Sequence, residues 1–279
     1  MVMVYRLPRL LGVAVTAVAA LLLSPIPSAT AQGCPDVEMV FARGTGEPPG
    51  VGGVGQAFVD AVRAQAGPRS MNVYPVNYAA SSDFMGDRIA FARTVVDGIR
   101  DAGTHIETTA ANCPDTKIVL GGFSQGAALA GYVTSAEIPQ EVPAEYRQYI
   151  PNPMPSEVAD HVAAVVLIGL PSPEFLSAGG APPITIGPSY VDKTLKVCAP
   201  DDTICNGAPA GPPNFAHAMY GVNGSTNDAA AYVVARLGPA PAAPAPAPAG
   251  PMMPAPAPGP AAAPMMPMAS PILAPAPSP

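Results

Sequence analysis

Ser124 lies in a sequence context that suggests chemistry. Residues 122–126 read GFSQG, which fits the pattern G-x-S-x-G. A β-rich run at 117–122 precedes the pattern and a small-residue segment at 127–131 follows it, which predicts a strand, a tight turn and a helix. Such a turn holds the serine in a strained backbone conformation, and the helix N-terminus behind it can stabilise an oxyanion. We therefore predict Ser124 as a nucleophile; the alternative is an ordinary turn with a capping serine.

A serine nucleophile needs a base, and the sequence contains three histidines. His105 lies in a predicted helix before Ser124, which is the wrong chain order for this arrangement. His161 begins a predicted strand, so it should lie at the end of the sheet opposite the serine. His217 follows the last predicted strand and fits the order serine, acid, histidine. We predict His217 as the base, and the other two as core or surface histidines.

The third group should be a carboxylate that orients the histidine and holds its tautomer. Asp201 and Asp202 follow the fifth predicted strand directly, and both lie between the cysteines at 198 and 205. A disulfide there would fix the loop that carries them. Spacing alone does not choose between the two. Asp192 precedes the strand, and Asp228 is better explained as a charge at a helix start.

Four cysteines, Cys34, Cys113, Cys198 and Cys205, indicate the redox compartment. An even number in an exported chain predicts two disulfides, for which four cysteines allow three pairings. Cys198 and Cys205 are seven apart and can close a small loop, which leaves Cys34 with Cys113. A metal site is the alternative, but the sequence has no CxxC pair or nearby histidine to support it.

The elements that must position these residues alternate along the chain. An alternation of strands and helices predicts an α/β fold, with a mostly parallel five-stranded sheet between two helical layers. Two proline-rich stretches, 139–155 and 171–188, are predicted as long surface loops. The predicted strands are 37–41, 73–76, 117–122, 162–168 and 194–197, and the predicted helices are about 85–110, 127–135 and 228–236.

Both ends of the chain are predicted to lie outside the folded domain, which we place at residues 32–238. Residues 1–31 have two arginines, an apolar core from Leu10 to Leu23 and the cleavage pattern Ala29-Thr30-Ala31, which predicts a signal peptide. An uncleaved anchor is the alternative. Residues 239–279 contain 16 Pro, 14 Ala and no charge, which predicts a disordered tail that samples polyproline II. This tail could be a plain spacer or a cell-wall or partner-binding stalk.

The charge of the chain argues against nucleic acid as a partner. The 279 residues carry 13 Lys and Arg against 20 Asp and Glu, a formal net charge of −7. Removing the two arginines of the signal peptide leaves 11 basic residues against 20 acidic ones, or −9. Phosphate binding needs a basic face, which this composition does not favour. Beyond the N-terminal segment, no stretch is long and apolar enough to predict a membrane span.

The folded part resembles the cutinase family of serine esterases, and most closely its mycobacterial members. The likeness covers roughly residues 33–237. It is carried by Ala42-Arg43-Gly44-Thr45, Tyr74-Pro75-Val76-Asn77-Tyr78, Gly121-Gly122-Phe123-Ser124-Gln125-Gly126-Ala127-Ala128, Cys198 with Asp202 and Cys205, and His217-Ala218-Met219-Tyr220-Gly221.

This resemblance implies specific roles at the site. It implies Ser124 as nucleophile, Asp202 rather than Asp201 as the carboxylate, and His217 as base. It also implies an oxyanion hole formed by Thr45 and Gln125, and the disulfides Cys34–Cys113 and Cys198–Cys205. No metal or organic cofactor is expected.

The resemblance further implies a hydrolase of short- to medium-chain esters, with little or no lid over its site. The signal peptide and the cysteines predict that the protein is secreted, and we expect it to be a monomer. A lipase, phospholipase, thioesterase or acyltransferase with the same residues is one alternative, and a non-catalytic wall-associated protein is another. The acyl pocket is expected to be apolar. Its candidate residues are Leu170, Phe175, Leu176, Ile184, Ile186 and Phe215.

Overall fold

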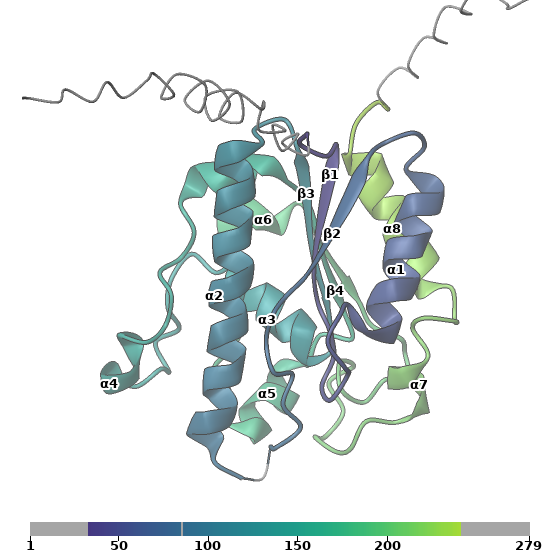
Figure 1. The fold of residues 1–279 in the computed structure, drawn as a ribbon. Coiled ribbons are helices and arrows are strands. Elements are labelled where there is room, and N and C mark those ends of the chain that lie inside the picture. Colours follow the sequence, from purple (N-terminus) through teal and green to yellow (C-terminus); the bar gives the residue numbers. More distant parts are fainter. Residues whose placement is uncertain (1–32, 85, 241–279) are drawn as a thin grey trace, which may run out of the picture. The chain divides into compact units, whose positions relative to one another are not determined.

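The computed structural model describes residues 33–84 and 86–240 (Figure 1). The predicted signal peptide (1–31) and the predicted tail from residue 241 onward lie outside the described residues, so both stay predictions. Within the described ranges, no helix is both long and apolar enough to cross a bilayer.

Strands and helices alternate through the described residues, as the sequence predicts. The strands are β1 (Val37–Ala42), β2 (Met71–Pro75), β3 (Lys117–Phe123), β4 (Val162–Ile168) and β5 (Thr194–Val197). The helices are α1 (Gly52–Gln65), α2 (Arg88–Asn112), α3 (Gln125–Val133), α4 (Ala144–Arg147), the 3₁₀ helix η2 (Ser156–His161), α5 (Pro173–Gly179), α6 (Pro188–Val191), α7 (Phe215–Ala218) and α8 (Ser225–Arg236).

The five strands form one parallel sheet in the order β2-β1-β3-β4-β5. α1 and α8 cover one face, while α2, α3 and α6 cover the other (Figure 1). The predicted three-layer α/β arrangement is confirmed, and the sheet is wholly rather than mostly parallel. Because all strands run in one direction, their carboxyl ends meet at one edge of the sheet, where β3 leads into Ser124.

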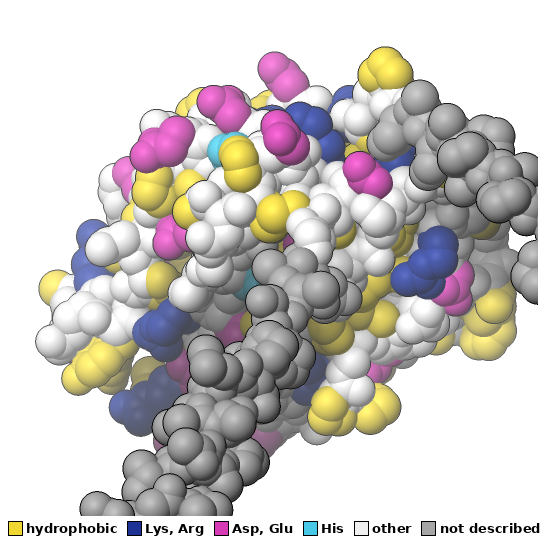
Figure 2. Space-filling model, turned by 45° about the horizontal axis from the view of Figure 1, so that its top comes forward, with side chains coloured by type: hydrophobic (Ala, Val, Ile, Leu, Met, Phe, Trp, Pro, Cys, Tyr) yellow, Lys and Arg dark blue, Asp and Glu magenta, His cyan; other side chains and the backbone are white. Residues whose placement is uncertain are grey.

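The surface of the described part carries acidic, basic and apolar side chains that are interspersed. On the face shown in Figure 2, many Asp and Glu side chains lie in the upper part among apolar ones, and Lys and Arg side chains form small groups, some of them beside acidic side chains. Phe215 exposes 77% of its surface two residues before His217, and Phe84 exposes 51% in the loop before α2. Two large aromatic side chains therefore face solvent, and one of them, Phe215, is a predicted acyl-pocket residue.

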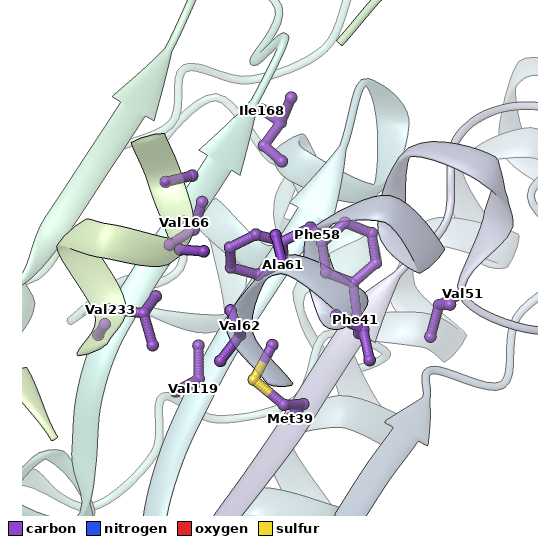
Figure 3. Close-up of a cluster of buried hydrophobic side chains, with 14 of the residues drawn as sticks. Met39, Phe41, Val51, Phe58, Ala61, Val62, Val119, Val166, Ile168 and Val233 are labelled. Carbon is purple, nitrogen blue, oxygen red and sulfur yellow. The ribbon is translucent and has the colours of Figure 1, made fainter. Parts of the chain in front are cut away.

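The sheet separates two hydrophobic clusters, because successive residues of a strand point to opposite faces. On the side of α1 and α8, Met39 and Phe41 of β1 share a cluster with Phe58 of α1, and the two phenylalanine rings lie 5.9 Å apart (Figure 3). On the other side, Leu120 of β3 shares a cluster with Leu129 of α3. β1 is buried at all six positions, so the centre of the sheet is a rigid support for the loops at its edge.

Helix α1 is absent from the sequence predictions. It begins with Gly52 and Gly53, both poor helix formers, and Val51 before them provides no side-chain cap. Its apolar stripe, Val54, Phe58 and Val62, is buried against the sheet. Burial of this apolar face against the sheet therefore stabilises α1, although the residues at its start do not predict a helix.

Other boundaries differ from the predictions for identifiable reasons. α2 begins at Arg88 because the Asp87 carboxylate accepts hydrogen bonds from the N–H groups of Ile89 (2.8 Å) and Ala90 (3.1 Å). The proline-rich stretches are not loops throughout, since α4, α5 and α6 lie in or beside them. Pro173 and Pro188 occupy the first turns of α5 and α6, where a missing N–H costs no helical hydrogen bond.

His105 fills a structural role away from the edge that carries Ser124. Its Nε2 lies 2.7 Å from Oε1 of Glu38, a carboxylate that is only 3% exposed, and its ring stacks on Tyr74 with centroids 3.5 Å apart. Asn72 also donates to Glu38, at 2.9 and 3.0 Å. His161 ends η2 and pairs with the Pro114 carbonyl. These contacts confirm the expectation that His105 and His161 are core or surface histidines.

Removing the His105 ring should therefore weaken the fold without touching the Ser124 edge. We expect His105→Ala to lower the free energy of unfolding by about 2–3 kcal/mol, because a buried carboxylate loses a hydrogen-bond partner. Urea unfolding of the full chain measures this. His161→Ala, the matched control, removes one bond to a carbonyl and should cost about 1 kcal/mol. If the two substitutions lower the free energy of unfolding equally, the hydrogen bond of His105 to Glu38 stabilises the fold no more than that of His161 to the Pro114 carbonyl.

Candidate active site

Ser124 occupies the sharp turn between β3 and α3. Its φ of 55° and ψ of −118° make it one of two non-glycine residues with positive φ among those described. A side chain is strained in this region, so the surrounding structure must hold it there. Part of that support is the hydrogen bond from the Ser124 N–H to the Ile168 carbonyl of β4, at 2.9 Å. The predicted strained turn is confirmed.

The two glycines of the pattern are required by close packing. A Cβ atom at Gly122 would overlap the Gly126 carbonyl, and one at Gly126 would overlap the Ala42 carbonyl at the end of β1. The start of α3 can therefore approach β1 and β3 only because both positions lack a side chain. This approach presents the Ser124 hydroxyl at the edge of the sheet.

His217 meets Ser124 across a separation of 93 residues. Its Nε2 lies 2.9 Å from the Ser124 Oγ, and its ring packs on Phe123 with centroids 5.0 Å apart. α7 carries His217, and the Asn214 side chain accepts from the His217 N–H at 3.2 Å to begin that helix. Gly169, with φ 58°, leaves space for the imidazole, because a Cβ there would lie 3.1 Å from its Cε1.

Asp202 is the aspartate that faces the histidine. Its carboxylate is fully buried, with Oδ2 2.8 Å from the Nδ1 of His217 and Oδ1 accepting from the Ile204 N–H at 2.9 Å. Asp201 is exposed, and its carboxylate has no hydrogen bond to His217. With the Nδ1 proton directed at Asp202, the Nε2 of His217 is left as the acceptor for the Ser124 hydroxyl. The three side chains thus form one hydrogen-bonded line.

Two disulfides brace the described fold. Cys34–Cys113 joins the segment before β1 to the end of α2, with Cα atoms 5.5 Å apart. Cys198–Cys205 closes the loop that carries Asp202, with Cα atoms 5.8 Å apart. This is the predicted pairing. Two disulfides and no free cysteine among the described residues indicate an extracytoplasmic location.

Thr45 lies in the loop after β1, and Gln125 is the first residue of α3. The Gln125 N–H is the first of α3 and has no intrahelical acceptor. Neither it nor the Thr45 N–H has a hydrogen-bond acceptor among the residues described. The Glu47 carboxylate fixes the Thr45 loop by accepting from the N–H groups of Gly44 (2.6 Å) and Gly53 (2.7 Å). Their role as donors to an oxyanion stays a prediction.

A family model described as cutinase matches residues 33–237, which span this whole site. The chain belongs to the cutinase family. Among curated relatives, "Probable carboxylesterase Culp7" of Mycobacterium tuberculosis is 53% identical over 62% of this chain and 89% of the relative. "Carboxylesterase Culp1" of the same organism is 44% identical, over 83% and 96%. "Phospholipase Culp4" is 40% identical, over 83% and 92%.

Solved structures show the same cutinase architecture. A Trichoderma reesei cutinase in complex with a phosphonate inhibitor is 27% identical, with a TM-score of 0.53 over 73% of this chain and 77% of that one. An acetyl xylan esterase has a TM-score of 0.56 over 74% of this chain and 100% of that one, at 24% identity. The second likeness shows the fold alone.

Tyr220 belongs to a motif that carries the family resemblance, but reasoning from the sequence assigned it no role at the site. It is fully buried, donates a hydrogen bond from its hydroxyl to Asp202 Oδ2 at 2.7 Å and accepts one from the Ala199 N–H at 2.9 Å. Burial, with a smaller effect of the bond to Asp202, raises the pKa of the Tyr220 phenol. Its position three residues after His217 was visible in the sequence, but that spacing alone assigns no contact.

The predicted acyl-pocket residues are not equivalent in this cutinase fold. Leu176 is buried, and Leu170 and Ile186 pack against the core cluster on the α3 side of the sheet. Ile184 lies over Gly131 of α3, and Phe215 is largely exposed. Three of the candidates therefore contribute to packing, and the pocket as a whole stays a prediction.

Proposed function

We propose that this cutinase-family chain is an exported serine carboxylesterase that hydrolyses short- to medium-chain acyl esters through an acyl-enzyme. The observation that carries the proposal is the continuous line from Ser124 Oγ to His217 (2.9 Å) and from His217 to Asp202 (2.8 Å). A hydroxyl, an imidazole and a buried carboxylate in this order are the groups that activate a serine for acyl transfer.

In the acylation half-reaction, the Ser124 hydroxyl attacks the ester carbonyl while the Nε2 of His217 takes its proton. The resulting imidazolium is stabilised by Asp202, which stays ionised. The oxyanion of the tetrahedral intermediate is held by the N–H groups of Thr45 and Gln125, each worth about 3–4 kcal/mol in comparable hydrolases. His217 then protonates the departing alcohol, leaving an ester on Ser124, and water repeats the sequence to release the acid.

The curated relatives support ester substrates for this site. Culp7 and Culp1 are named carboxylesterases, and Culp4 is named a phospholipase. Ser124, His217 and Asp202 could serve a carboxylic ester or the acyl ester of a phospholipid, because both reactions begin with attack on an ester carbonyl. A phospholipid is therefore the second substrate class to test.

The loop beside α3 supports a site without a moving lid. The Tyr132 hydroxyl donates to the Pro182 carbonyl at 2.5 Å, and the Ser135 hydroxyl donates to the Thr185 carbonyl at 2.9 Å. The Gly187 N–H donates to the Thr134 carbonyl at 3.0 Å. These bonds fasten one candidate wall of the acyl pocket to a core helix, which favours substrates that reach a preformed opening.

Export and location follow from the predicted ends of the chain together with the disulfides. We infer that residues 1–31 direct export and that residues 239–279 form a spacer through which the domain associates with the cell wall. The domain 32–238 then acts outside the cytoplasm as a monomer on ester or lipid substrates. The net charge of −7 gives no support for nucleic acid as a partner.

The decisive experiment measures acyl release by the mature chain. p-Nitrophenyl esters from acetyl to palmitoyl define the acyl preference, and a diacyl phospholipid tests the second class. An alkyl phosphonate should stop turnover in proportion to the fraction of Ser124 labelled, as located by mass spectrometry. Turnover of no ester in the panel, or phosphonate labelling at another residue with full loss of activity, would contradict the proposal.

A further inference from the structure

We propose that Tyr220 is a positioning residue, whose hydroxyl holds the Asp202 carboxylate in the orientation that serves His217. This inference rests on the proposed function. Tyr220 Oη and His217 Nδ1 both approach the same oxygen, Asp202 Oδ2, at 2.7 and 2.8 Å. The other oxygen, Oδ1, accepts only from the Ile204 N–H among the residues described. The carboxylate is thus fixed at both ends by named donors.

The direction of the Tyr220 proton follows from its second partner. The Ala199 N–H donates to the phenol oxygen at 2.9 Å, so the phenol is the acceptor in that bond. Its own proton is then directed at Asp202, which carries lone pairs and no proton when ionised. Burial raises the pKa of the phenol, so Tyr220 keeps its proton and remains a donor to the carboxylate. Tyr220 therefore links the end of β5 to the buried carboxylate.

Few other groups can compensate the buried charge of Asp202. Among the described residues, its sole ionic partner is His217. Cys205 Sγ lies 3.1 Å from Oδ2, but its sulfur is in a disulfide and has no proton to donate. Asp201 is exposed next to it along the chain, and Phe123, which packs on the imidazole, carries no charge. The Tyr220 hydroxyl is thus the one uncharged side chain among these neighbours that donates to Asp202.

The groups around Asp202 determine the direction in which the pH profile moves when the Tyr220 hydroxyl is removed. Without the Tyr220 hydroxyl, Oδ2 holds more of its negative charge unshared, so Asp202 stabilises the His217 imidazolium more strongly. The base of the variant would then be protonated at a higher pH than in the natural protein. Activity requires neutral His217, so the acidic limb of the pH profile should move to higher pH.

Tyr220→Phe removes the oxygen and keeps the ring. That ring packs edge-on against His217, with centroids 6.3 Å apart, and against Phe123 at 6.0 Å. Tyr74→Phe is the matched control, since the Tyr74 hydroxyl also donates to an aspartate, Asp101, at 3.0 Å. The control changes a phenol–carboxylate bond between β2 and α2, outside the line of Ser124, His217 and Asp202.

The experiment compares the pH dependence of kcat/KM for p-nitrophenyl butyrate in the full chain. For Tyr220→Phe we expect the acidic midpoint to rise by about half to one pH unit. We also expect kcat to fall about tenfold, with KM within about twofold, because orientation rather than binding is affected. Tyr74→Phe should match the natural protein in both. A folded Tyr220→Phe protein whose profile superimposes on that of the natural protein would overturn the proposal.

A second substitution tests the opposite sign and does not depend on removing the hydroxyl. Incorporating 3-fluorotyrosine at position 220 makes the phenol a stronger donor, so the acidic midpoint should move to lower pH. The far-downfield proton resonance of His217 Nδ1 should shift in both Tyr220 proteins and stay unchanged in Tyr74→Phe. An unshifted resonance in both would refute the inference. If no ester is turned over by any protein, the resonance still tests the contact, so failure of the proposed function is distinguishable.

Discussion

Ser124→Ala, His217→Ala and the double variant are all expected to lower kcat for an accepted ester by about 10⁶-fold, with no further loss in the double variant. The Ser124 hydroxyl and the His217 imidazole lie 2.9 Å apart and act on one proton, so removing either removes the same step. Single-turnover and steady-state assays of the mature chain measure the loss. KM should change little, because neither side chain is needed to bind the acyl chain.

Ser156→Ala is the control for this comparison. Its exposed hydroxyl lies at the start of η2, just before β4 begins, whereas Ser124 lies at the edge where the strands end. We expect it to retain kcat within about twofold, with far-ultraviolet circular dichroism unchanged in all variants. If the loss in kcat of the double variant equalled the product of the two single losses, Ser124 and His217 would act in separate steps. That result would contradict the shared step inferred from their contact.

Asp202→Asn is expected to lower kcat about 10⁴-fold, whereas Asp201→Asn leaves it within about twofold. The amide that replaces Asp202 would present N–H₂ or a neutral oxygen to the Nδ1 of His217. When the amide donates, the imidazole proton moves to Nε2, and Ser124 loses its acceptor. Asp201 is exposed and pairs with none of the three side chains, so its charge is dispensable.

The paired aspartates make this test internally controlled. Both substitutions remove one negative charge from adjacent positions of one disulfide loop, so long-range electrostatics change almost equally. Unfolding in urea should show that both proteins are folded before their rates are compared. A larger loss from Asp201→Asn than from Asp202→Asn would contradict the proposed orientation of His217.

The disulfide loop, the Tyr220 contact and the Ser124 turn share one feature of the fold. β3, β4 and β5 are neighbours in the sheet, and each ends at the same edge. Ser124 follows β3, Gly169 follows β4 and Asp202 follows β5 within a few residues. Because the sheet is wholly parallel, residues from three distant parts of the chain lie at one edge, where they form the site.

Much of the fold, including the strands and the turn at Ser124, could be predicted from local sequence patterns. The apolar run of β4 reads as a strand buried on both faces, and the glycines around Ser124 identify a tight turn. The elements with strong local signals, such as β4 and β5, agree with the structure to the residue. α1 shows where this fails, because its glycine-rich start carries no local signal and its stability comes from packing on the sheet.

The sequence by itself determined the strand and helix alternation, the serine turn, the chain order that favours His217 and a pairing of the cysteines. Spacing left Asp201 and Asp202 open, and the family resemblance implied Asp202. Only the tertiary structure shows the contact of Asp202 with the imidazole and the bond that Tyr220 donates to the same carboxylate oxygen. Local patterns are set by neighbours within a turn or a strand. The direction of one side chain in a loop is set by contacts with residues far away in the chain, which spacing cannot encode.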